Sequence, residues 1–283
     1  MYSELVPTSE RISSSTSQKK IGVIVKVARV FDCFNTMNTE LSLAQLSRLC
    51  GMPKTTMVNI IRTLETEGYL DRVANTPNYK LGLKFLEKSY YVQEALPIIR
   101  LAAPYLEELL EETGQNVYLT THRDGQLLYL HNCLKYSNKV KYSAAGRMLP
   151  LHSTAAGKAM MSHMSREEIE QIVRLQGLAA RTPNTITDLD TLWNELQTAK
   201  RQGYALDTEE ETIGICCVAM AITDAAGKPV GSVSVSGAKQ NITPDRIKDY
   251  VSSIIRVRDT LSTQARLFPC RSCMGIEDRK SVV

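Results

Sequence analysis

The chain has 283 residues, 43% of them hydrophobic and 23% charged, and a formal net charge of +4. That length favours two domains, and so small a charge does not by itself indicate a nucleic-acid-binding protein. A membrane protein is excluded because no apolar run reaches the roughly 18 residues of a span. The seven cysteines lack the spacing of a disulfide scaffold, and residues 1–20 are polar and lack the apolar stretch of a signal peptide. We therefore expect a cytoplasmic protein.

The first third of the chain has the pattern of three short helices and a hairpin. Ser42 is a candidate N-cap for the second helix, Gly51 breaks the chain after it, and Pro53 opens the third helix, where a missing N–H costs least. After a flexible tail at 1–20, the expected helices cover residues 21–34, 43–50 and 53–67, and the expected strands cover 69–73 and 79–83. This order, over residues 21–83, is typical of a winged helix-turn-helix. Residues 84–96 resume a helical pattern and are expected to link two domains.

The third helix is a candidate DNA-recognition helix because its two faces differ. At about 100° per residue, the inward face carries Met57, Ile60, Ile61 and Leu64, and the outer face carries Thr55, Asn59, Arg62 and Thr66. In a major groove, an amide can pair with adenine and a guanidinium with guanine or phosphate. Lys54, Thr55 and Thr56 stand at the helix start, where recognition helices meet bases and backbone. The alternative is an ordinary surface helix, which the neighbouring Gly51 turn and hairpin make less favoured.

These residues resemble the DNA-binding domain of the IclR-type bacterial transcriptional regulators. The segment LSLAQLSRLCGMPKTTMVNIIRTLETEGYL, followed by YKLGLK, carries the Gly-x-Pro-Lys-Ser/Thr-Thr start of that family's recognition helix and its Tyr-x-Leu-Gly end of the wing. Asn59 stands where the family usually has Arg, so we expect an altered base preference and an unchanged fold. Near the hairpin, Arg72, Lys80 and Lys84 are further candidates for phosphate contacts.

The second domain, expected over residues 97–265, mixes helices with successive strands. Helices are expected at 98–112, 155–163 and 165–175. A further helix is expected to be capped by Thr187 with Asp190 and to end at Gly203, and a last helix is expected to start at Thr243. Strands are expected at 116–122, 127–133, about 139–144, 204–207, 215–223 and 229–236. This alternation favours an antiparallel α+β arrangement over a doubly wound sheet. Residues 266–283 match nothing in the family and are expected to form a C-terminal tail.

Three further motifs extend the resemblance to the IclR family over about residues 21–265. They are GRMLPLHSTAAGKA at 146–159, GYALDTEEETIGICCVAMAI at 203–222 and VSVSG at 233–237. The resemblance implies a GAF-like α/β domain with an antiparallel sheet, which binds an effector and mediates oligomerisation. The effector-binding residues that it implies are Ala155, Ala156, Asp207, Cys217, Ser234 and Ser236. Met220–Ala221 stands where the family often has Ala-Pro, which affects only a local bend.

The residue types of this implied site suit a small carboxylate. Ser234 and Ser236 are two apart on a strand, so their hydroxyls face the same side. Hydroxyls, a thiol and the backbone N–H groups of Ala155 and Ala156 at a helix start can bind an anion. Asp207 would accept a ligand hydroxyl or hold the site by bonding backbone amides, and it would repel a bare acid, so the ligand should carry more than its carboxylate.

Structural roles are the alternative interpretation of several of these residues. The two serines could be ordinary sheet residues, and Cys217 could be a core cysteine. Cys216 points the opposite way and is expected in the core. We expect His152, Glu209 and Glu210 to serve the fold.

An enzyme and a metal site are weaker hypotheses. Cys217, His152 and Asp207 are the residue types of a nucleophile, a base and an orienting acid, but nothing in their spacing demands that geometry. Cys270 and Cys273 form a lone pair, whereas structural zinc needs about four ligands. We therefore expect no catalytic residue, no metal and no cofactor.

Together these patterns predict a sequence-specific DNA-binding regulator, a repressor of a catabolic operon, controlled by a small metabolite such as a carboxylate or sugar acid. A single winged helix buries too little DNA for high specificity, so a homodimer or homotetramer on double-stranded operator DNA is expected. The alternatives are a metabolite-binding protein that does not bind DNA, and a cysteine-dependent enzyme that uses Cys217.

Overall fold

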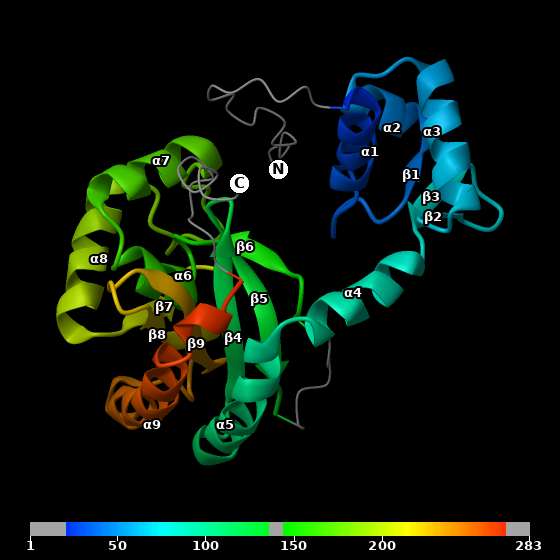
Figure 1. The fold of residues 1–283 in the computed structure, drawn as a ribbon. Helices are drawn as coiled ribbons and strands as arrows, with labels where there is room; N and C mark the ends of the chain where they lie inside the picture. Colours follow the sequence, from blue (N-terminus) through cyan, green and yellow to red (C-terminus); the bar gives the residue numbers. More distant parts are fainter. Residues whose placement is uncertain (1–20, 136–143, 270–283) are drawn as a thin grey trace, which may run out of the picture. The chain divides into compact units, whose positions relative to one another are not determined.

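The computed structural model describes residues 21–135 and 144–269. The chain forms two compact units, which divide between Glu94 and Ala95 (Figure 1). Within the described residues, no helix is both long and apolar enough to cross a membrane. Four features expected from the sequence fall wholly or mostly outside the described residues: the tail at 1–20, the strand at 139–144, the tail at 266–283 and the cysteine pair at 270 and 273 within that tail.

The N-terminal unit combines helices with a three-stranded antiparallel sheet in the order β1-β3-β2. Its elements are α1 (Gly22–Asp32), β1 (Leu41–Ser42), α2 (Leu43–Cys50), α3 (Lys54–Thr66), β2 (Leu70–Arg72), β3 (Asn78–Leu81) and α4 (Lys84–Glu94). The helix-turn-helix and the hairpin that follows it are confirmed. Strand β1 was not expected, because two residues are too few to show a periodic pattern.

Local sequence signals set both ends of α2. Ser42 forms a capping box at its start, and Gly51 ends it in the left-handed region at φ 62°, a conformation that favours glycine. Leu46 and Cys50, four residues apart, share the buried face of the helix. Leu49 lies outside this face and is 37% exposed.

The C-terminal unit is built on a six-stranded antiparallel sheet in the order β6-β5-β4-β9-β8-β7. Its strands are β4 (Asn116–Arg123), β5 (Gln126–Cys133), β6 (Met148–Pro150), β7 (Ala205–Thr208), β8 (Ile215–Thr223) and β9 (Pro229–Ala238). Its helices are α5 (Pro97–Thr113), α6 (Ala155–Met161), α7 (Arg166–Gln176), α8 (Leu189–Gln202), α9 (Pro244–Ser262) and the short 3-10 helix η1 (Ala265–Leu267). The expected antiparallel α+β fold is confirmed.

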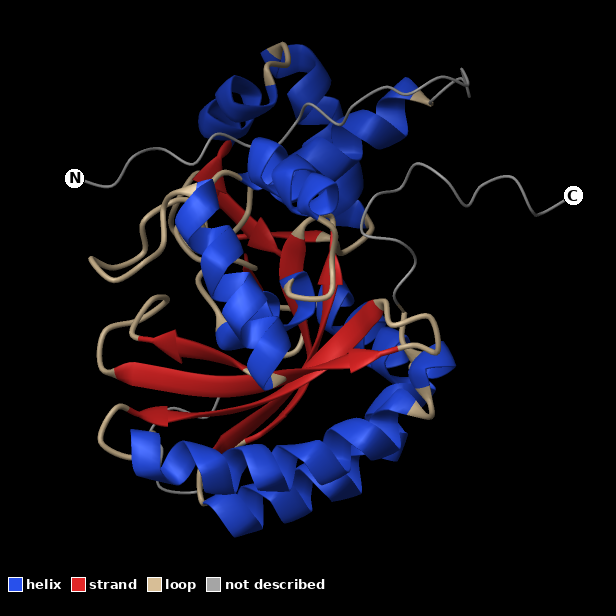
Figure 2. Cartoon of the chain, turned by 90° about the vertical axis from the view of Figure 1, so that its left-hand side faces the viewer, coloured by secondary structure: helices blue, strands red, loops and turns tan. Residues whose placement is uncertain are grey.

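The two faces of this sheet differ in the size of their side chains, and helices cover both (Figure 2). Large apolar residues such as Val218 and Met220 of β8 face α5 and α9 in one core. On the opposite face, the alternating positions Ala205, Ala219 and Ala221 are small and belong to the core that contains α6, α7 and α8. Alternation of side chains along a strand produces this division. The small residues leave room for α6 to pack over β7, β8 and β9.

Two helices begin one residue away from the expected position. Pro53 is the N-cap of α3 and not its first residue, because its ψ of 143° is still extended. The cap of α8 is Asp188, whose carboxylate accepts the backbone N–H of Thr191 at 2.8 Å. The expected cap at Thr187 and Asp190 was therefore wrong. Aspartate is among the strongest N-cap residues when its backbone is extended, and Asp188 has that conformation.

Candidate DNA-binding and effector-binding sites

Helix α3 presents one apolar and one polar face, as its sequence predicts. Its buried residues are Met57, Ile60, Ile61 and Leu64. Lys54, Thr55, Asn59 and Arg62 are exposed, and Thr56 is half-buried. Within the described part of the chain, the side chains of Lys54, Thr55, Asn59 and Arg62 make no hydrogen bond or ion pair. The polar face is therefore free to bond to another molecule.

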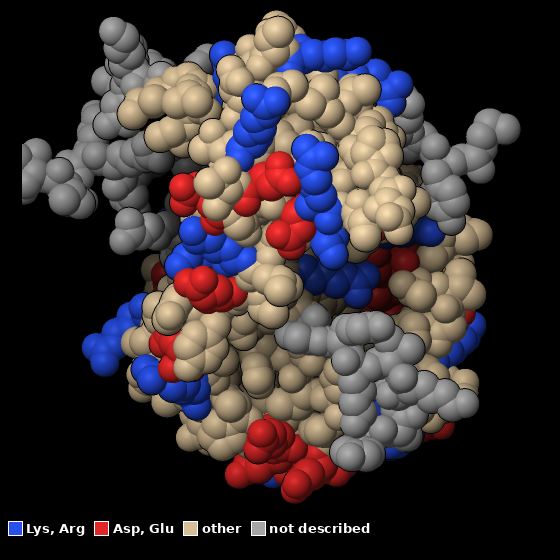
Figure 3. All heavy atoms as spheres, turned by 90° about the vertical axis from the view of Figure 1, so that its right-hand side faces the viewer, with Lys and Arg blue, Asp and Glu red and all other residues tan. Residues whose placement is uncertain are grey.

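The basic residues near the hairpin differ in their surroundings. Arg72 donates to Glu65 at 2.9 Å and stacks over the ring of Tyr79. Lys84 donates to the carbonyl oxygen of Glu67 at 2.9 Å. Both cations are thus engaged within their own unit, whereas the side chain of Lys80 has no partner among the described residues. On the face shown in Figure 3, basic side chains are interspersed with acidic and uncharged ones. A binding surface here would depend on the placement of a few groups and not on a broad basic field.

In the C-terminal unit, four neighbouring strands contribute one polar row to the small-residue face of the sheet. Asp207 of β7 pairs with Cys217 of β8, Cys217 with Ser236 of β9, and Ser236 with Asn116 of β4. The next row on this face contains Ala219, Ser234 and Tyr118. Residues that are far apart in the sequence are thus neighbours across the sheet.

A cavity of about 380 Å³ lies over this face. It is lined by all six residues of the predicted effector site: Ala155, Ala156, Asp207, Cys217, Ser234 and Ser236. Gly157 allows α6 to pack directly against the backbone of Leu151, because a Cβ at residue 157 would lie 2.2 Å from the carbonyl oxygen of Leu151. Within the described residues, the backbone N–H groups of Ala155 and Ala156 make no hydrogen bond, so both remain available at the cavity wall.

Asp207 is buried and tied to the loop that follows it. Its Oδ1 accepts the backbone N–H of Glu210 at 2.7 Å. Burial raises the pKa of Asp207 to about 7, the nearby Glu210 carboxyl adds to the rise, and the hydrogen bond and Lys158 oppose it. Near neutral pH this side chain therefore exists in both protonation states and can accept or donate a hydrogen bond.

The Cys217 thiol donates to the hydroxyl of Ser236 at 2.9 Å. Burial, together with nearby Asp207, raises the pKa of Cys217 well above its usual range, so the sulfur is a neutral thiol and a weak nucleophile. His152 does not line this cavity. The structure therefore does not assemble the nucleophile, base and acid of the enzyme hypothesis.

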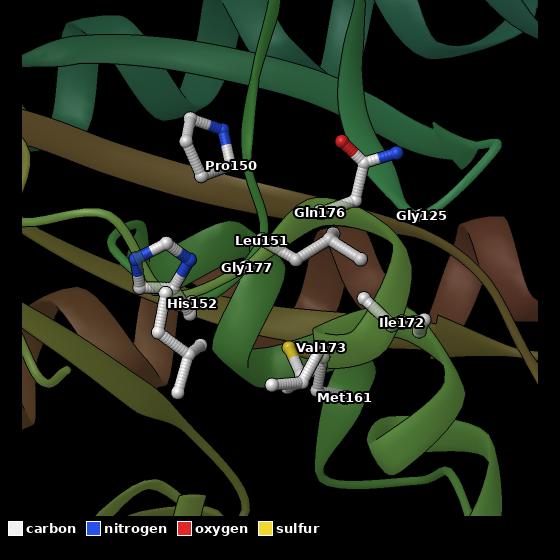
Figure 4. Close-up of a pocket in the computed structure, with 10 residues that line it drawn as sticks. Gly125, Pro150, Leu151, His152, Met161, Ile172, Val173, Gln176 and Gly177 are labelled. Carbon is white, nitrogen blue, oxygen red and sulfur yellow. The ribbon is translucent and has the colours of Figure 1, made fainter. Parts of the chain in front are cut away.

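His152 lies beside a separate cavity of about 10 Å³, whose wall includes Leu151 and Ile172 (Figure 4). That space is about the size of one water molecule. The Nε2 atom of His152 is 3.2 Å from the carbonyl oxygen of Ala179, and burial lowers the pKa of the ring. A neutral, buried histidine bonded to the backbone agrees with the structural role expected for it.

Two glutamates after Asp207 serve the fold, also as expected. Glu210 and Lys158 form a buried ion pair with Nζ and Oε1 2.5 Å apart. Glu209 accepts the backbone N–H of Gly214 at 2.9 Å and pairs with Lys239. These contacts fix the loop that leads from β7 to β8. Cys216 is also placed as expected: it is buried in the core between the sheet and helices α5 and α9, on the other side of the sheet from Cys217.

Sequence reasoning missed several residues that line the large cavity: Tyr118, Tyr129, Lys135, Arg147 and Glu211. The two tyrosine rings meet edge to face, with their centroids 5.3 Å apart. Tyr118 could have been found from strand alternation, since it pairs with Ser234. Arg147 stands within a motif that the sequence had already singled out, but only the fold brings it to the cavity. Among the described residues, no group of three or more His, Cys, Asp or Glu side chains could hold a metal.

Comparisons with known proteins agree with this architecture. Residues 91–263 match the family described as bacterial transcriptional regulator IclR C-terminal, and residues 23–74 match the IclR helix-turn-helix domain. The chain is 30% identical over 227 residues to the HTH-type transcriptional regulator XynR of Escherichia coli, covering 80% of this chain and 90% of that protein. It is also 30% identical over 220 residues to the HTH-type transcriptional repressor AllR of Escherichia coli, covering 77% and 80% respectively.

Among solved structures, the chain shares its fold with an IclR homolog from Microbacterium hydrocarbonoxydans complexed with 4-hydroxybenzoate. The TM-score is 0.69 at 21% identity, and the match covers 85% of this chain and 98% of the other. The relatives named above are transcriptional regulators and not enzymes. The chain belongs to the IclR family of bacterial transcriptional regulators.

Proposed function

We propose that this regulator is a repressor that binds operator DNA through α3 and is controlled by a small hydroxylated acid in the large cavity. The observation that carries the proposal is the pairing, in one chain, of an unpartnered polar helix face with a polar cavity. Residues 21–83 would read the DNA, 84–96 would link, and 97–265 would bind the effector and assemble subunits. A cytoplasmic location belongs to the proposal, since the five described cysteines are free thiols.

On the DNA side, α3 would enter the major groove with its first residues against bases and backbone. Asn59 suits the edge of an adenine, and Arg62 suits a guanine or a phosphate. Lys54, Thr55 and Thr56 would contact the backbone at the helix start. The wing would add Lys80, while Arg72 and Lys84 are already held by neighbours. Specific affinity would thus come from a few placed contacts in each recognition helix.

Assembly of two or four copies is part of the proposal, and α4 supplies a surface for it. No residue of α4 is buried within the chain. Leu83, Leu86, Tyr90, Tyr91 and Val92 are all more than half exposed. An apolar surface of this kind on a soluble domain usually marks an interface. Pairing with a second copy would cover it and would bring two recognition helices to one pseudo-palindromic operator.

The charges around the cavity favour an anionic effector. Arg147 and Lys135 line it, and neither side chain has a hydrogen-bond or ion-pair partner among the described residues. Of the two carboxylates that line it, Glu211 is already engaged by the hydroxyl of Ser153 at 2.6 Å and by Arg181 at 3.3 Å. Asp207 is the other, and its raised pKa leaves it partly neutral. A carboxylate near the two free cations would be attracted more than repelled.

The remaining wall favours hydroxyl groups and a flat body on that acid. Asp207, Ser234 and Ser236 offer hydrogen bonds to ligand hydroxyls, and the rings of Tyr118 and Tyr129 offer an apolar surface. A volume of about 380 Å³ falls in the range of small-molecule sites. Sugar acids and hydroxylated aromatic acids both meet this description. The 4-hydroxybenzoate bound to the Microbacterium homolog is a ligand of the second kind.

Control of DNA binding would be a shift of population. An effector that binds better to one arrangement of the chain or of its assembly changes operator affinity by the same coupling free energy. The test begins with a DNA duplex enriched by the protein from a random pool. Fluorescence anisotropy should show tight binding that weakens steeply with salt, because phosphate contacts release counterions.

The same assay tests the effector. D-gluconate and 4-hydroxybenzoate should be added separately, and release of the duplex by one of them supports the proposal. Failure to enrich any duplex, together with calorimetric binding of an acid, would favour the metabolite-binding alternative without DNA. Turnover of an acid that is lost in Cys217→Ala would favour the enzyme.

A further inference from the structure

Two cysteines of the N-terminal unit bring their sulfur atoms into contact. Cys33 directly follows α1, and Cys50 is the last residue of α2. Their Sγ atoms are 3.4 Å apart, and both residues belong to the same hydrophobic core. Among the described cysteines at 33, 50, 133, 216 and 217, no other pair brings its sulfur atoms into contact. Residues 17 positions apart in the chain are thus placed as a thiol pair.

The contact is close enough for a covalent bond after a small movement. A disulfide has an S–S distance of about 2.05 Å, so the sulfurs would approach by about 1.4 Å. Both cysteines end their helices, where the backbone can adjust more easily than in a helix interior. Cys33 is 5% exposed and Cys50 is 7% exposed, so the pair is within reach of a small oxidant and shielded from large thiols.

The two sulfurs also have different chemical roles. The Cys33 thiol lies 3.2 Å from the carbonyl oxygen of Arg29. The hydrogen bond between the two sulfur atoms lowers the pKa of Cys33, although burial and Asp32 oppose the effect. The same hydrogen bond, together with burial, raises the pKa of Cys50. Cys33 is therefore the better first nucleophile, and Cys50 is the neighbouring thiol that is close enough to close the disulfide.

We propose that Cys33 and Cys50 form a peroxide-sensitive thiol pair whose oxidation to a disulfide weakens DNA binding. The Cys33 thiolate attacks one oxygen of hydrogen peroxide, the O–O bond breaks, and the departing hydroxide takes up a proton as water, leaving a sulfenic acid. The Cys50 sulfur then attacks the Cys33 sulfur, the S–O bond breaks and a second water leaves. One peroxide gains two electrons from two thiols, giving one disulfide and two waters.

The path from this pair to the recognition helix is short. Cys50 is followed by Gly51 in its left-handed turn and by buried Met52. The hydroxyl of Ser47 donates to the carbonyl oxygen of Met52 at 2.5 Å, and the N–H of Met52 donates back to Ser47 at 3.0 Å. A shift of Cys50 therefore moves the start of α3, because closely packed segments transmit displacement.

The size of the effect follows from the contacts at that helix start. One well-placed contact to a base edge is worth about 1–3 kcal/mol, so its loss weakens binding by about fivefold or more. The effect on DNA rests on the proposed function, whereas formation of the disulfide does not. The two parts therefore need separate measurements.

The first measurement is chemical. Reduced full-length protein, with Cys270 and Cys273 replaced by Ser, is treated with hydrogen peroxide, and the remaining thiols are alkylated under denaturing conditions. Peptide mass spectrometry should find Cys33 linked to Cys50, and dithiothreitol should reverse the link. If both cysteines are still alkylated after treatment, the proposal is wrong. This readout uses the unsubstituted pair, so it does not depend on the folding of a variant at either position.

The second measurement is binding of a duplex that the reduced protein has enriched from a random pool. Peroxide should weaken the affinity about fivefold or more, and dithiothreitol should restore it. Cys33→Ala and Cys50→Ala should each bind the duplex and lose the sensitivity, whereas the matched control Cys133→Ala should keep it. A disulfide that forms without changing affinity overturns the regulatory claim. Failure to enrich any duplex instead counts against the proposed DNA binding.

Discussion

Asp207 and Glu210 are joined by a hydrogen bond from the backbone N–H of Glu210 to the carboxylate of Asp207, at 2.7 Å. The side chain of Glu210 in turn forms a buried ion pair with Lys158. Lys158 belongs to α6, the helix that also supplies Ala155 and Ala156 to the cavity. The acidic group that lines the cavity is therefore connected through one loop to a helix that lines the same cavity. A ligand that moves Asp207 would therefore act on α6 through this hydrogen bond and ion pair.

This connection predicts a large loss of stability when Lys158 is replaced. Lys158→Met leaves the Glu210 carboxylate buried without its cation, which should lower the free energy of unfolding by about 3–5 kcal/mol. The double variant Lys158→Met/Glu210→Leu should recover most of the loss. Lys239→Met, which breaks the exposed pair with Glu209, should cost less than about 1 kcal/mol. Urea denaturation measures all three, and equal losses for the two lysines would contradict the prediction.

The raised pKa of Asp207 predicts a pH-dependent stability. Unfolded aspartate loses its proton near pH 4, whereas burial raises the pKa of folded Asp207 to about 7. Between these values the folded state holds the proton more tightly, so this group's contribution to stability falls as pH rises from about 4 to about 7 and is constant above.

Asp207→Asn should remove that dependence. The midpoint temperature of thermal unfolding is measured for the variant and for the unsubstituted chain from pH 4 to 8. The midpoint of the unsubstituted chain minus that of the variant should become smaller, or change sign, as the pH rises. Glu210, whose pKa is also raised by burial, is present in both proteins, so only its interaction with the Asp207 charge differs between them. Parallel curves for the two proteins would show that Asp207 titrates at its ordinary value.

Much of the fold could be predicted because it depends on local signals. The cap at Ser42, the turn at Gly51 and the apolar face of α3 are each encoded within a few residues, and each is present in the structure. The cavity residues Asp207 and Cys217 were expected from the resemblance of their motif to the IclR family.

Other parts could not be predicted because they depend on contacts between distant segments. Arg147 and Tyr129 reach the cavity only through pairing between β5 and the segment before β6. The contact of Cys33 with Cys50 arises from the packing of α1 against α2. The periodicity of each helix shows which face is apolar but not which other helix that face contacts.

The unpartnered face of α3 predicts that Arg62→Ala weakens specific DNA binding. If Arg62 contacts a base, affinity should fall by about 1–3 kcal/mol and specificity at that position should relax. If it contacts a phosphate, all sequences should weaken alike and the salt slope should fall by about one unit. Arg100→Ala, an exposed arginine of the C-terminal unit, removes the same charge and should change neither quantity. Anisotropy titrations at several salt concentrations separate these outcomes.

The two free cations at the cavity predict that Arg147→Ala weakens the binding of acids. Loss of a charge-assisted hydrogen bond should cost about 1.5–3 kcal/mol, or about tenfold or more in affinity. The amide analogue of an acid that binds should lose much less, because it carries no charge to pair. Arg174→Ala, at an exposed arginine of α7, serves as the matched control. Isothermal titration calorimetry gives each affinity, and an equal loss for acid and amide would show that Arg147 acts by shape and not by charge.

The exposed apolar residues around α4 predict that one charge placed there disrupts assembly. Leu86 is 71% exposed in the single chain, so Leu86→Asp should leave the fold of the subunit intact. If a second copy covers this residue, the variant buries an unpaired carboxylate at the interface, and the assembly should dissociate at micromolar concentrations. Sedimentation velocity should then show a smaller species, with an unchanged circular dichroism spectrum. Leu175→Asp, at an exposed leucine of α7, should not alter the sedimentation. If Leu86→Asp sediments like the unsubstituted chain, assembly uses another surface.

Loss of the dimer should also lower operator affinity far more than Arg62→Ala does, because both recognition helices must bind together to reach one operator.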